Sequence, residues 1–413
     1  METAGLVIVG ASYAGLQVAD AARAKGYQGS ICLVGEEAFA PYQRPPLSKG
    51  LLLGKQTSDA LIIRSPAYFE EQRINLLLKT RVEAINREAK TVQLQDGSFK
   101  AYEWLVLATG ARCRQVRLPE VPQSGVYSLR GLDDGLAIHA MAQTARKVCV
   151  IGAGFIGLEV ASALSQRGLQ VEVLEAGSRV LQRSVPEAVS KYFEDLHIDR
   201  GVRLHHGAVV TAMESDAQGA VQSVVLSDGR RLACDAVVVG IGVEANDELA
   251  AQAGLRCDAG IVVDTCGRTA DPFIFAAGDC ARFPNPYGVD PQAPLRLESI
   301  QASNDLARAV ASVVAGEPAP YNAVPWFWSD QYESKLQIAG LAADGDEAVL
   351  RGDPASGRFS LFLLRQGRIV CVHSVSRPAE HLLARKLIEA RAMASPEQLA
   401  DEQFALKQLL PSA

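Results

Sequence analysis

The chain has 413 residues, 48% hydrophobic and 21% charged, which is the composition of a globular protein of two or three domains rather than a disordered one. Its formal net charge of −6 argues against nucleic-acid binding through bulk charge. No apolar run reaches the roughly 18 residues of a membrane span, and the N-terminus does not resemble a signal peptide. We therefore expect a cytoplasmic protein, monomeric or homodimeric, without nucleic-acid or membrane contacts.

The chain opens with a strand–turn–helix–strand pattern. Apolar residues 6–9 run into the turn Gly10-Ala11-Ser12-Tyr13-Ala14-Gly15, and the second apolar run, 30–34, leads to Glu36. Such a unit presents helix N–H groups to a dinucleotide pyrophosphate, and an acid about twenty residues later binds a ribose hydroxyl. Ser12 stands where the middle glycine is usual. The alternative is a G-x-S-x-G nucleophile elbow, but the position of Glu36 favours a dinucleotide.

Residues 41–49 contain three prolines and predict a stiff loop at the carboxyl edge of the sheet, where ligands bind in this class of fold. Arg44 and Lys49 would then lie beside a cofactor, although a solvated basic loop is the alternative. Strands are expected at 76–78, 82–85 and 91–94, with an Asp96-Gly97 hairpin turn after the last. The buried run 104–107 ends in small residues that leave room for a cofactor or simply pack closely.

A second copy of the opening unit occupies the middle of the chain. Residues 148–151 lead into Gly152-Ala153-Gly154-Phe155-Ile156-Gly157, a helical stretch, a strand at 171–174 and Glu175. An Asp228-Gly229 turn and an apolar strand ending at Gly242 complete the same plan, which indicates an internal duplication. Two dinucleotide sites in one chain imply electron or hydride transfer between them.

The pattern of predicted elements changes in the last part of the chain. Residues 273–279 form a strand that delivers Asp279 at its carboxyl end. Short strands at 336–338, 348–350, 359–362 and 370–372 follow without intervening helices, and helices are expected at 379–392 and 396–410. The predicted class is therefore α/β, with two Rossmann-like dinucleotide-binding domains and a C-terminal α+β domain.

The cysteines and histidines indicate packing rather than metal binding. None of the eight cysteines forms CxxC, CxxxxC or a zinc spacing. Cys280 follows an apolar strand and would have a lowered pKa if it opened a helix, but we favour packing there. His205 and His206 are adjacent and would face opposite ways on a strand. No metal is expected.

Several stretches together are more specific than the glycine turns. They are PYQRPPLSKG (41–50), VLATGAR (106–112), VVVGIG (237–242), AAGDCARF (276–283), RLESIQ (296–301) and PWFWSDQY (325–332). On these residues the chain resembles NADH-dependent ferredoxin reductases of the putidaredoxin reductase type. These are flavoproteins of glutathione-reductase-like architecture that serve cytochrome P450 or Rieske-type ring-hydroxylating dioxygenase systems. Their electrons pass from NADH through FAD, one at a time, to a [2Fe–2S] ferredoxin.

The resemblance implies an FAD-binding domain at 1–112 and 245–320, an NADH-binding domain at 113–244 and a C-terminal interface domain at 321–413. The FAD residues it implies are Gly10, Ser12, Tyr13, Ala14, Gly15, Glu36, Arg44, Lys49, Val82, Ala108, Thr109, Gly110, Arg130, Gly278, Asp279, Glu298, Ser299, Ile300 and Trp326. The NADH residues it implies are Gly152, Gly154, Phe155, Ile156, Gly157, Glu159, Glu175, Gly240, Ile241 and Gly242. Lys49 and Glu159 are expected to pair beside flavin N5.

The charged residues indicate which coenzyme and which kind of electron acceptor the protein would bind. Glu175 would repel the 2′-phosphate of NADPH and bind the ribose of NADH, and Arg179 is the nearby cation that would weaken this preference. Ferredoxins are usually acidic, so a local basic face is expected on this acidic chain. The candidate cations are Arg64, Arg308, Lys335, Arg385 and Lys386.

Three alternatives remain open from sequence. An NADH oxidase or peroxidase would have a redox cysteine near the flavin, whereas no cysteine lies between Cys32 and Cys113. A rubredoxin reductase is separated only weakly by sequence. A redox-sensing binding protein similar to apoptosis-inducing factor would be expected to carry a targeting segment and basic patches. Without the resemblance, the aromatic run 326–328 would be read as core.

Overall fold

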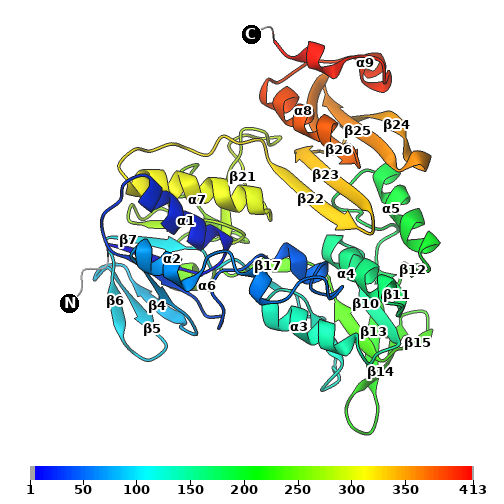
Figure 1. The fold of residues 1–413 in the computed structure, drawn as a ribbon, viewed down its shortest axis with the longest axis horizontal. Coiled ribbons are helices and arrows are strands. Elements are labelled where there is room, and N and C mark those ends of the chain that lie inside the picture. The colour runs from blue at the N-terminus through cyan, green and yellow to red at the C-terminus, as the bar shows by residue number, and fades with distance from the viewer. Residues whose placement is uncertain (1–4, 412–413) are drawn as a thin grey trace.

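The computed structural model describes residues 5–411, which form three lobes (Figure 1). Two lobes contain a parallel five-stranded sheet and the third contains an antiparallel one. This arrangement confirms the predicted fold class.

The first lobe is built on a parallel sheet with the strand order β19-β7-β1-β2-β3. Its strands are β1 (Leu6–Val9), β2 (Ile31–Val34), β3 (Ile74–Leu77), β7 (Trp104–Leu107) and β19 (Ile274–Ala276). The helices around it are α1 (Tyr13–Ala24), α2 (Pro66–Glu71), α6 (Glu248–Gln252) and α7 (Ile300–Val314). Two small sheets complete the lobe, with strands β4 (Val82–Asn86), β5 (Thr91–Leu94), β6 (Phe99–Ala101), β18 (Ile261–Val262), β20 (Ala281–Pro284) and β21 (Pro294–Leu295).

The second lobe repeats this plan with the strand order β12-β11-β10-β16-β9, again parallel throughout. Its strands are β9 (Val126–Ser128), β10 (Lys147–Ile151), β11 (Gln170–Glu175), β12 (Arg203–His206) and β16 (Ala236–Val239). Its helices are α3 (Leu132–Met141), α4 (Phe155–Gln166) and α5 (Glu187–Asp199), and its antiparallel layer is β13 (Val210–Ser215), β14 (Val221–Leu226) and β15 (Arg231–Ala233). The predicted duplication is therefore confirmed.

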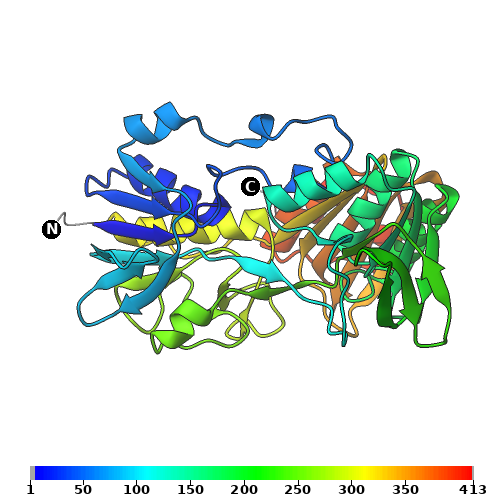
Figure 2. The same ribbon diagram turned by 90° about the horizontal axis from the view of Figure 1, so that it is seen from below.

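The chain passes between these lobes through a two-stranded antiparallel ladder, β8 (Ala111–Cys113) with β17 (Val243–Ala245). The ladder lies at both predicted crossings, while the predicted domain boundaries themselves remain a prediction. A second connection is the segment between β2 and α2, which extends from the first lobe across to the second (Figure 2). Its Leu47, Leu51 and Leu52 are buried in one hydrophobic core with residues of α4 and β10.

The proline-rich part of this segment differs from the expected loop. Pro45–Ser48 forms a short 3₁₀ helix, η1, with its two prolines in the first turn. Prolines are tolerated there because the first N–H groups of a helix have no intrahelical partner. A second short 3₁₀ helix, η2 (Asp59–Leu61), follows. The segment therefore has a fixed shape that holds Lys49 at the end of η1.

The third lobe is an antiparallel sheet, β22-β23-β26-β25-β24, covered by C-terminal helices. Its strands are β22 (Trp326–Gln331), β23 (Ser334–Gly340), β24 (Glu347–Asp353), β25 (Arg358–Arg365) and β26 (Arg368–Val375). Its helical segments are η3 (Pro354–Ser356), α8 (Pro378–Glu389), α9 (Pro396–Ala400) and η4 (Leu406–Leu409).

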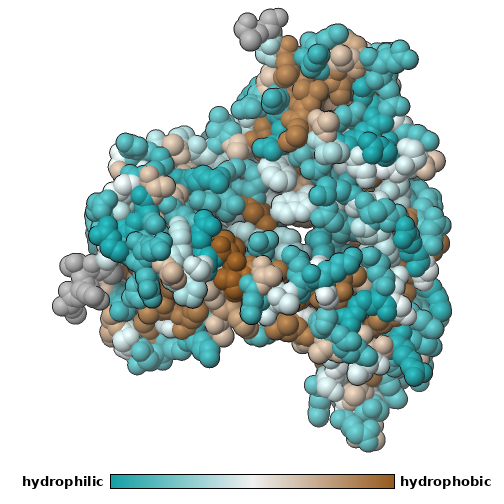
Figure 3. Space-filling view, viewed as in Figure 1, coloured by the Kyte–Doolittle hydropathy of each residue, from teal (hydrophilic) through white to brown (hydrophobic). Residues whose placement is uncertain are grey.

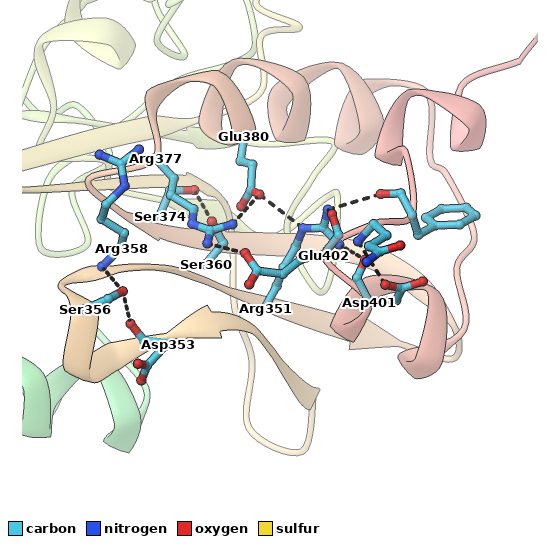
Figure 4. A network of polar contacts seen from close by, with 12 residues as sticks. Arg351, Asp353, Ser356, Arg358, Ser360, Ser374, Arg377, Glu380, Asp401 and Glu402 are labelled. Carbon is cyan, nitrogen blue, oxygen red and sulfur yellow. Dashed lines mark hydrogen bonds and ion pairs between the residues drawn. The ribbon is translucent and has the colours of Figure 1, made fainter.

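The predicted helix over 396–410 is wrong, because α9 ends at Ala400 and η4 starts only at Leu406. The cause is Arg351 on β24, which is 5% exposed and reaches across to the segment between them (Figure 4). Its guanidinium donates to the backbone carbonyls of Leu399, Asp401, Glu402 and Phe404 and also pairs with Glu380. These contacts hold residues 401–404 against β24 in a turn, in which the Asp401 carbonyl also accepts from the Phe404 N–H at 3.0 Å, so the helix does not continue.

The cysteines behave as the packing interpretation predicts. Cys149, Cys280 and Cys371 are at most 1% exposed, and none of the eight cysteines is in a disulfide. Burial raises the pKa of the Cys280 thiol, contrary to the helix-opening alternative. Of the helices in residues 5–411, none has the length and apolarity needed to cross a membrane.

Candidate active site

Both glycine turns have the shape of a phosphate cradle. A Cβ added to Gly10 would collide with the Ala108 carbonyl, and one added to Gly152 would meet the Gly240 carbonyl. The small-residue strand ends predicted from sequence are therefore what the two turns pack against. A Cβ on Gly154 would meet no described atom within 4 Å, so this side of the second turn is open. The helices behind the turns, α1 and α4, begin without a side-chain cap, which leaves their first N–H groups for an anion.

Charged side chains gather in front of the first turn. Arg44 donates to the Ser12 hydroxyl at 3.2 Å and to the Arg130 carbonyl at 2.6 Å. Arg130 in turn pairs with Asp279 at 2.8 Å. Glu298 interacts electrostatically with Asp279 and Arg130, and burial raises its pKa. These five predicted residues come from distant parts of the chain and meet at one place in front of the first glycine turn.

The remaining FAD candidates lie on the elements that enclose this place. Gly278 packs against Ala14, because a Cβ on Gly278 would lie 2.9 Å from the Ala14 Cβ. Thr109 is fixed through its hydroxyl to the Asn246 carbonyl at 2.6 Å. Ser299 caps α7 by accepting from the Ala302 N–H at 3.1 Å. The others are Gly15 on α1, Val82 buried at the start of β4, and Gly110 beside the Arg130 guanidinium.

Glu36 does not join the charged residues in front of the first glycine turn. It is 68% exposed and pairs with Arg81 at 3.2 Å. The neighbouring Glu37 pairs instead with Arg44 at 2.5 Å and accepts from the Tyr42 hydroxyl at 2.5 Å. Sequence reasoning missed Glu37, and the adjacent acid in Gly35-Glu36-Glu37 was its only signal. A ribose role for Glu36 remains a prediction.

Lys49 and Glu159 form an ion pair, as the family resemblance implies. Lys49 Nζ lies 2.5 Å from Glu159 Oε2, and the two side chains are 22% and 3% exposed. The carboxylate also accepts from the Ser48 hydroxyl at 2.5 Å and from the Ser329 hydroxyl at 2.7 Å. Glu159 lies on α4, directly behind the second glycine turn. The pair therefore joins the second site to the segment that crosses from the first.

The acid predicted for the second site, Glu175, lies beside the second glycine turn. Glu175 ends β11 and accepts from the Ala153 N–H at 2.8 Å, so its carboxylate faces the turn. Arg179 is turned away, because its guanidinium donates to the carbonyls of Val185 at 2.9 Å and Gln182 at 3.1 Å. The cation that would have favoured a 2′-phosphate is therefore engaged with backbone. The remaining predicted NADH residues lie on the same elements: Gly157 is on α4, and Ile241 and Gly242 follow the end of β16.

A pocket of about 530 Å³ lies beside the ion pair. It is lined by Tyr13 and Ile300 from the first lobe, by Lys49, and by Trp328 from the third lobe. The space-filling view shows the surface hollowed where the lobes meet (Figure 3). Burial raises the pKa of Tyr13 to about 12, so its hydroxyl is neutral at pH 7.

The aromatic run of β22 is half-buried rather than core. Phe327 packs on Phe155, the first residue of α4, with ring centroids 4.7 Å apart. Trp326 and Trp328 lie on the opposite face of the strand, 5.5 Å apart. Ile156 is 45% exposed in the second site. The third lobe thus contributes aromatic surface to both sites.

The comparisons with known proteins agree with this geometry. The chain matches the pyridine nucleotide-disulphide oxidoreductase family over residues 4–307 and the reductase C-terminal family over residues 326–410. It is 42% identical to rhodocoxin reductase of Rhodococcus erythropolis, covering 97% of this chain and 93% of that one. It is also 42% identical to the anthranilate 1,2-dioxygenase system ferredoxin–NAD(+) reductase component of Burkholderia cepacia, covering 98% of both.

Among solved structures, the covalent putidaredoxin reductase–putidaredoxin complex matches with a TM-score of 0.94 at 38% identity, covering 99% of this chain and 98% of that chain. The matched family uses a flavin and a nicotinamide dinucleotide, and both glycine turns have the close backbone packing that a dinucleotide turn requires; the assignment of FAD to the first turn and NADH to the second stays a prediction. The chain belongs to the pyridine nucleotide-disulphide oxidoreductase family and, within it, to the ferredoxin reductases of oxygenase systems, which use NADH and FAD.

Proposed function

We propose that this chain passes electrons from NADH through FAD to a [2Fe–2S] ferredoxin, which in turn serves a cytochrome P450 or a ring-hydroxylating dioxygenase. The observation that carries the proposal is the Lys49–Glu159 ion pair, which stands between the two glycine-turn sites. Bound FAD supplies a hydride acceptor that can release its electrons singly, which suits a one-electron iron–sulfur acceptor.

The residues of the chain position and polarise rather than break bonds. The two turns and their helices would hold the pyrophosphates, with Arg44 and Arg130 at the first. Lys49 would place a positive charge beside the flavin ring, which would stabilise the anionic reduced flavin. Glu159 would keep Lys49 there, because its buried carboxylate holds the ammonium at 2.5 Å.

The ferredoxin would dock over the pocket that Trp328 lines. Arg64 also lines this pocket, and Lys335 pairs with another lining residue, Asp330, at 3.5 Å. Arg308 lies one helical turn beyond the lining residue Asn304 on α7. Arg385 lies 5.1 Å over the Trp326 ring, next to the exposed Lys386. An acidic ferredoxin would meet these cations although the whole chain carries −6.

An oxidase or peroxidase is less well supported. Cys280, which directly follows Asp279 in the chain, is fully buried and donates to the carbonyls of Leu107 and Ala277, both at 3.4 Å. Burial raises the pKa of this thiol, which disfavours the reactive thiolate.

Acceptor comparison tests the proposal. The FAD-loaded protein would be given NADH and, separately, a [2Fe–2S] ferredoxin, a rubredoxin, oxygen or peroxide as acceptor. We expect turnover to be fastest with the ferredoxin. Faster turnover with rubredoxin or peroxide would replace the proposal with the corresponding alternative, and reduction of none would favour a binding role.

A further inference from the structure

A buried chain of hydrogen bonds leads from Glu159 away from the pocket. Ser329 Oγ donates to Glu159 Oε1 at 2.7 Å. Gln331 Nε2 donates to Ser329 Oγ at 3.2 Å, and Gln331 Oε1 lies 2.9 Å from His197 Nε2. All four side chains are at most 3% exposed, so each contact is made without competition from bulk water.

Along this series of hydrogen bonds, every donor points toward the Glu159 carboxylate. Gln331 Oε1 only accepts, so His197 must carry its proton on Nε2. Burial lowers the pKa of His197 to about 4, which keeps the ring neutral at pH 7. Its Nδ1 is buried with no hydrogen-bond partner within the described chain, so His197 ends the series. The Ser329 hydroxyl, supported by the Gln331 amide, is therefore left to donate to Glu159.

This series of hydrogen bonds connects the second and third lobes. Ser329 and Gln331 alternate with Trp328 and Asp330 along β22, so one face of the strand holds Glu159 while the other lines the pocket. His197 belongs to α5 of the second lobe. The lobe that lines the proposed docking pocket thus also fixes the carboxylate that holds Lys49.

We propose that Ser329 and Gln331 are positioning residues that set the strength with which Glu159 holds Lys49, and hence the reduction potential of the flavin. This inference rests on the proposed function, which places Lys49 beside the flavin. Without the Ser329 hydroxyl, Glu159 Oε1 loses its one described donor, so the carboxylate is free to rotate and no longer holds the Lys49 ammonium in one place. A displaced or less firmly paired Lys49 stabilises the reduced, anionic flavin less.

The test compares Ser329→Ala with Ser360→Ala in the FAD-loaded protein. Ser360 is a matched control because it is a fully buried serine of the same sheet whose hydroxyl bonds Ser374 at 3.2 Å instead of Glu159. The readouts are the flavin midpoint potential, the NADH dissociation constant and the rate of flavin reduction by NADH. Ser329→Thr retains the hydroxyl, and Gln331→Met removes the supporting amide from a side chain of similar size.

We expect Ser329→Ala to lower the equilibrium constant for flavin reduction about tenfold. For a two-electron couple this corresponds to a midpoint potential that is about 30 mV more negative. The NADH dissociation constant should stay unchanged, Gln331→Met should shift the potential in the same direction, and Ser329→Thr and Ser360→Ala should keep the wild-type value. A Ser329→Ala potential equal to that of Ser360→Ala would overturn the inference, and if Ser329→Ala does not fold, an unshifted Gln331→Met would do so. Lys49→Gln separates the two proposals: an unchanged potential in that variant removes the assumed place of Lys49 beside the flavin.

Discussion

Lys49 and Glu159 are 110 positions apart in the chain, and their Nζ and Oε2 atoms are 2.5 Å apart in the structure. The contact depends on the segment that leaves the first lobe after β2 and buries Leu47, Leu51 and Leu52 in the core of the second. The same burial sets the end of η1, where Lys49 projects toward α4. The pair is thus a product of how two lobes share one hydrophobic core, and it places one cation where the two cofactor sites approach each other.

Reversing charge at the proposed docking face should weaken ferredoxin binding selectively. We expect Arg64→Glu with Arg308→Glu to raise the KM for the ferredoxin about tenfold at low salt, and less at high salt, because screening weakens both charges. The rate of flavin reduction by NADH should not change. The control is Arg231→Glu, since Arg231 is 68% exposed on the antiparallel layer of the second lobe. Equal effects of the two reversals would place docking elsewhere.

Coenzyme choice should depend on Glu175. Glu175→Gln removes the negative charge that disfavours a 2′-phosphate, so the preference for NADH over NADPH should fall about tenfold in kcat/KM. Glu172→Gln is the matched control on the same strand, because Glu172 pairs with Arg203 and His205 instead of facing the turn. Steady-state kinetics with both coenzymes measures the ratio. An undiminished preference in Glu175→Gln would show that another group selects the coenzyme.

Arg351 should be a main support of the third lobe. Arg351→Met removes the arginine donor from four backbone carbonyls and leaves Glu380 paired only with Arg377, so we expect a loss of about 3 kcal/mol in the free energy of unfolding. Urea unfolding followed by fluorescence measures it, and limited proteolysis should show cleavage between α9 and η4 first. Arg203→Met removes an arginine that is 65% exposed and should cost at most about 0.5 kcal/mol. Equal costs for the two would contradict the account.

Stability should fall on mild acidification. Burial lowers the pKa of His197 and of His373 to about 4 in the folded protein. The unfolded chain, with a histidine pKa near the ordinary value of about 6.5, binds more protons between these values. Each histidine therefore contributes stability that is complete above about pH 6.5 and is lost at up to about 1.4 kcal/mol per pH unit as the pH falls toward 4.

Urea unfolding at about pH 7.5 and about pH 5 measures this loss directly. His381 is a third buried histidine with a pKa lowered to about 4, so His373→Phe should give a shallower pH dependence than the wild type without abolishing it. A wild-type stability that is equal at the two pH values would mean that these histidines titrate normally.

The sequence predicts those features that depend on local chemistry. The glycine turns, their strands and the Asp96-Gly97 hairpin need only residue types at fixed spacing, and all three are where they were expected. The helix over 396–410 fails because Arg351, which interrupts it, lies some fifty residues earlier and acts only through tertiary structure.

The polar surroundings of Glu159 show the same limit. Lys49 and Glu159 were expected to pair from the family resemblance, but no spacing in the sequence relates Ser329, Gln331 or His197 to them. Alternation along β22 gives Ser329 and Gln331 a common face once the strand is known. Which element packs on that face is decided by the docking of the third lobe on α4 and α5.

Two-step anaerobic stopped-flow spectroscopy tests the central claim most directly. The FAD-loaded protein would be mixed first with NADH and then with a [2Fe–2S] ferredoxin, with the visible flavin band followed throughout. The account predicts rapid bleaching with NADH, much slower bleaching with NADPH, and rapid recovery on addition of ferredoxin. A protein that binds no flavin, or a bleached flavin that recovers only with oxygen or peroxide, would contradict it.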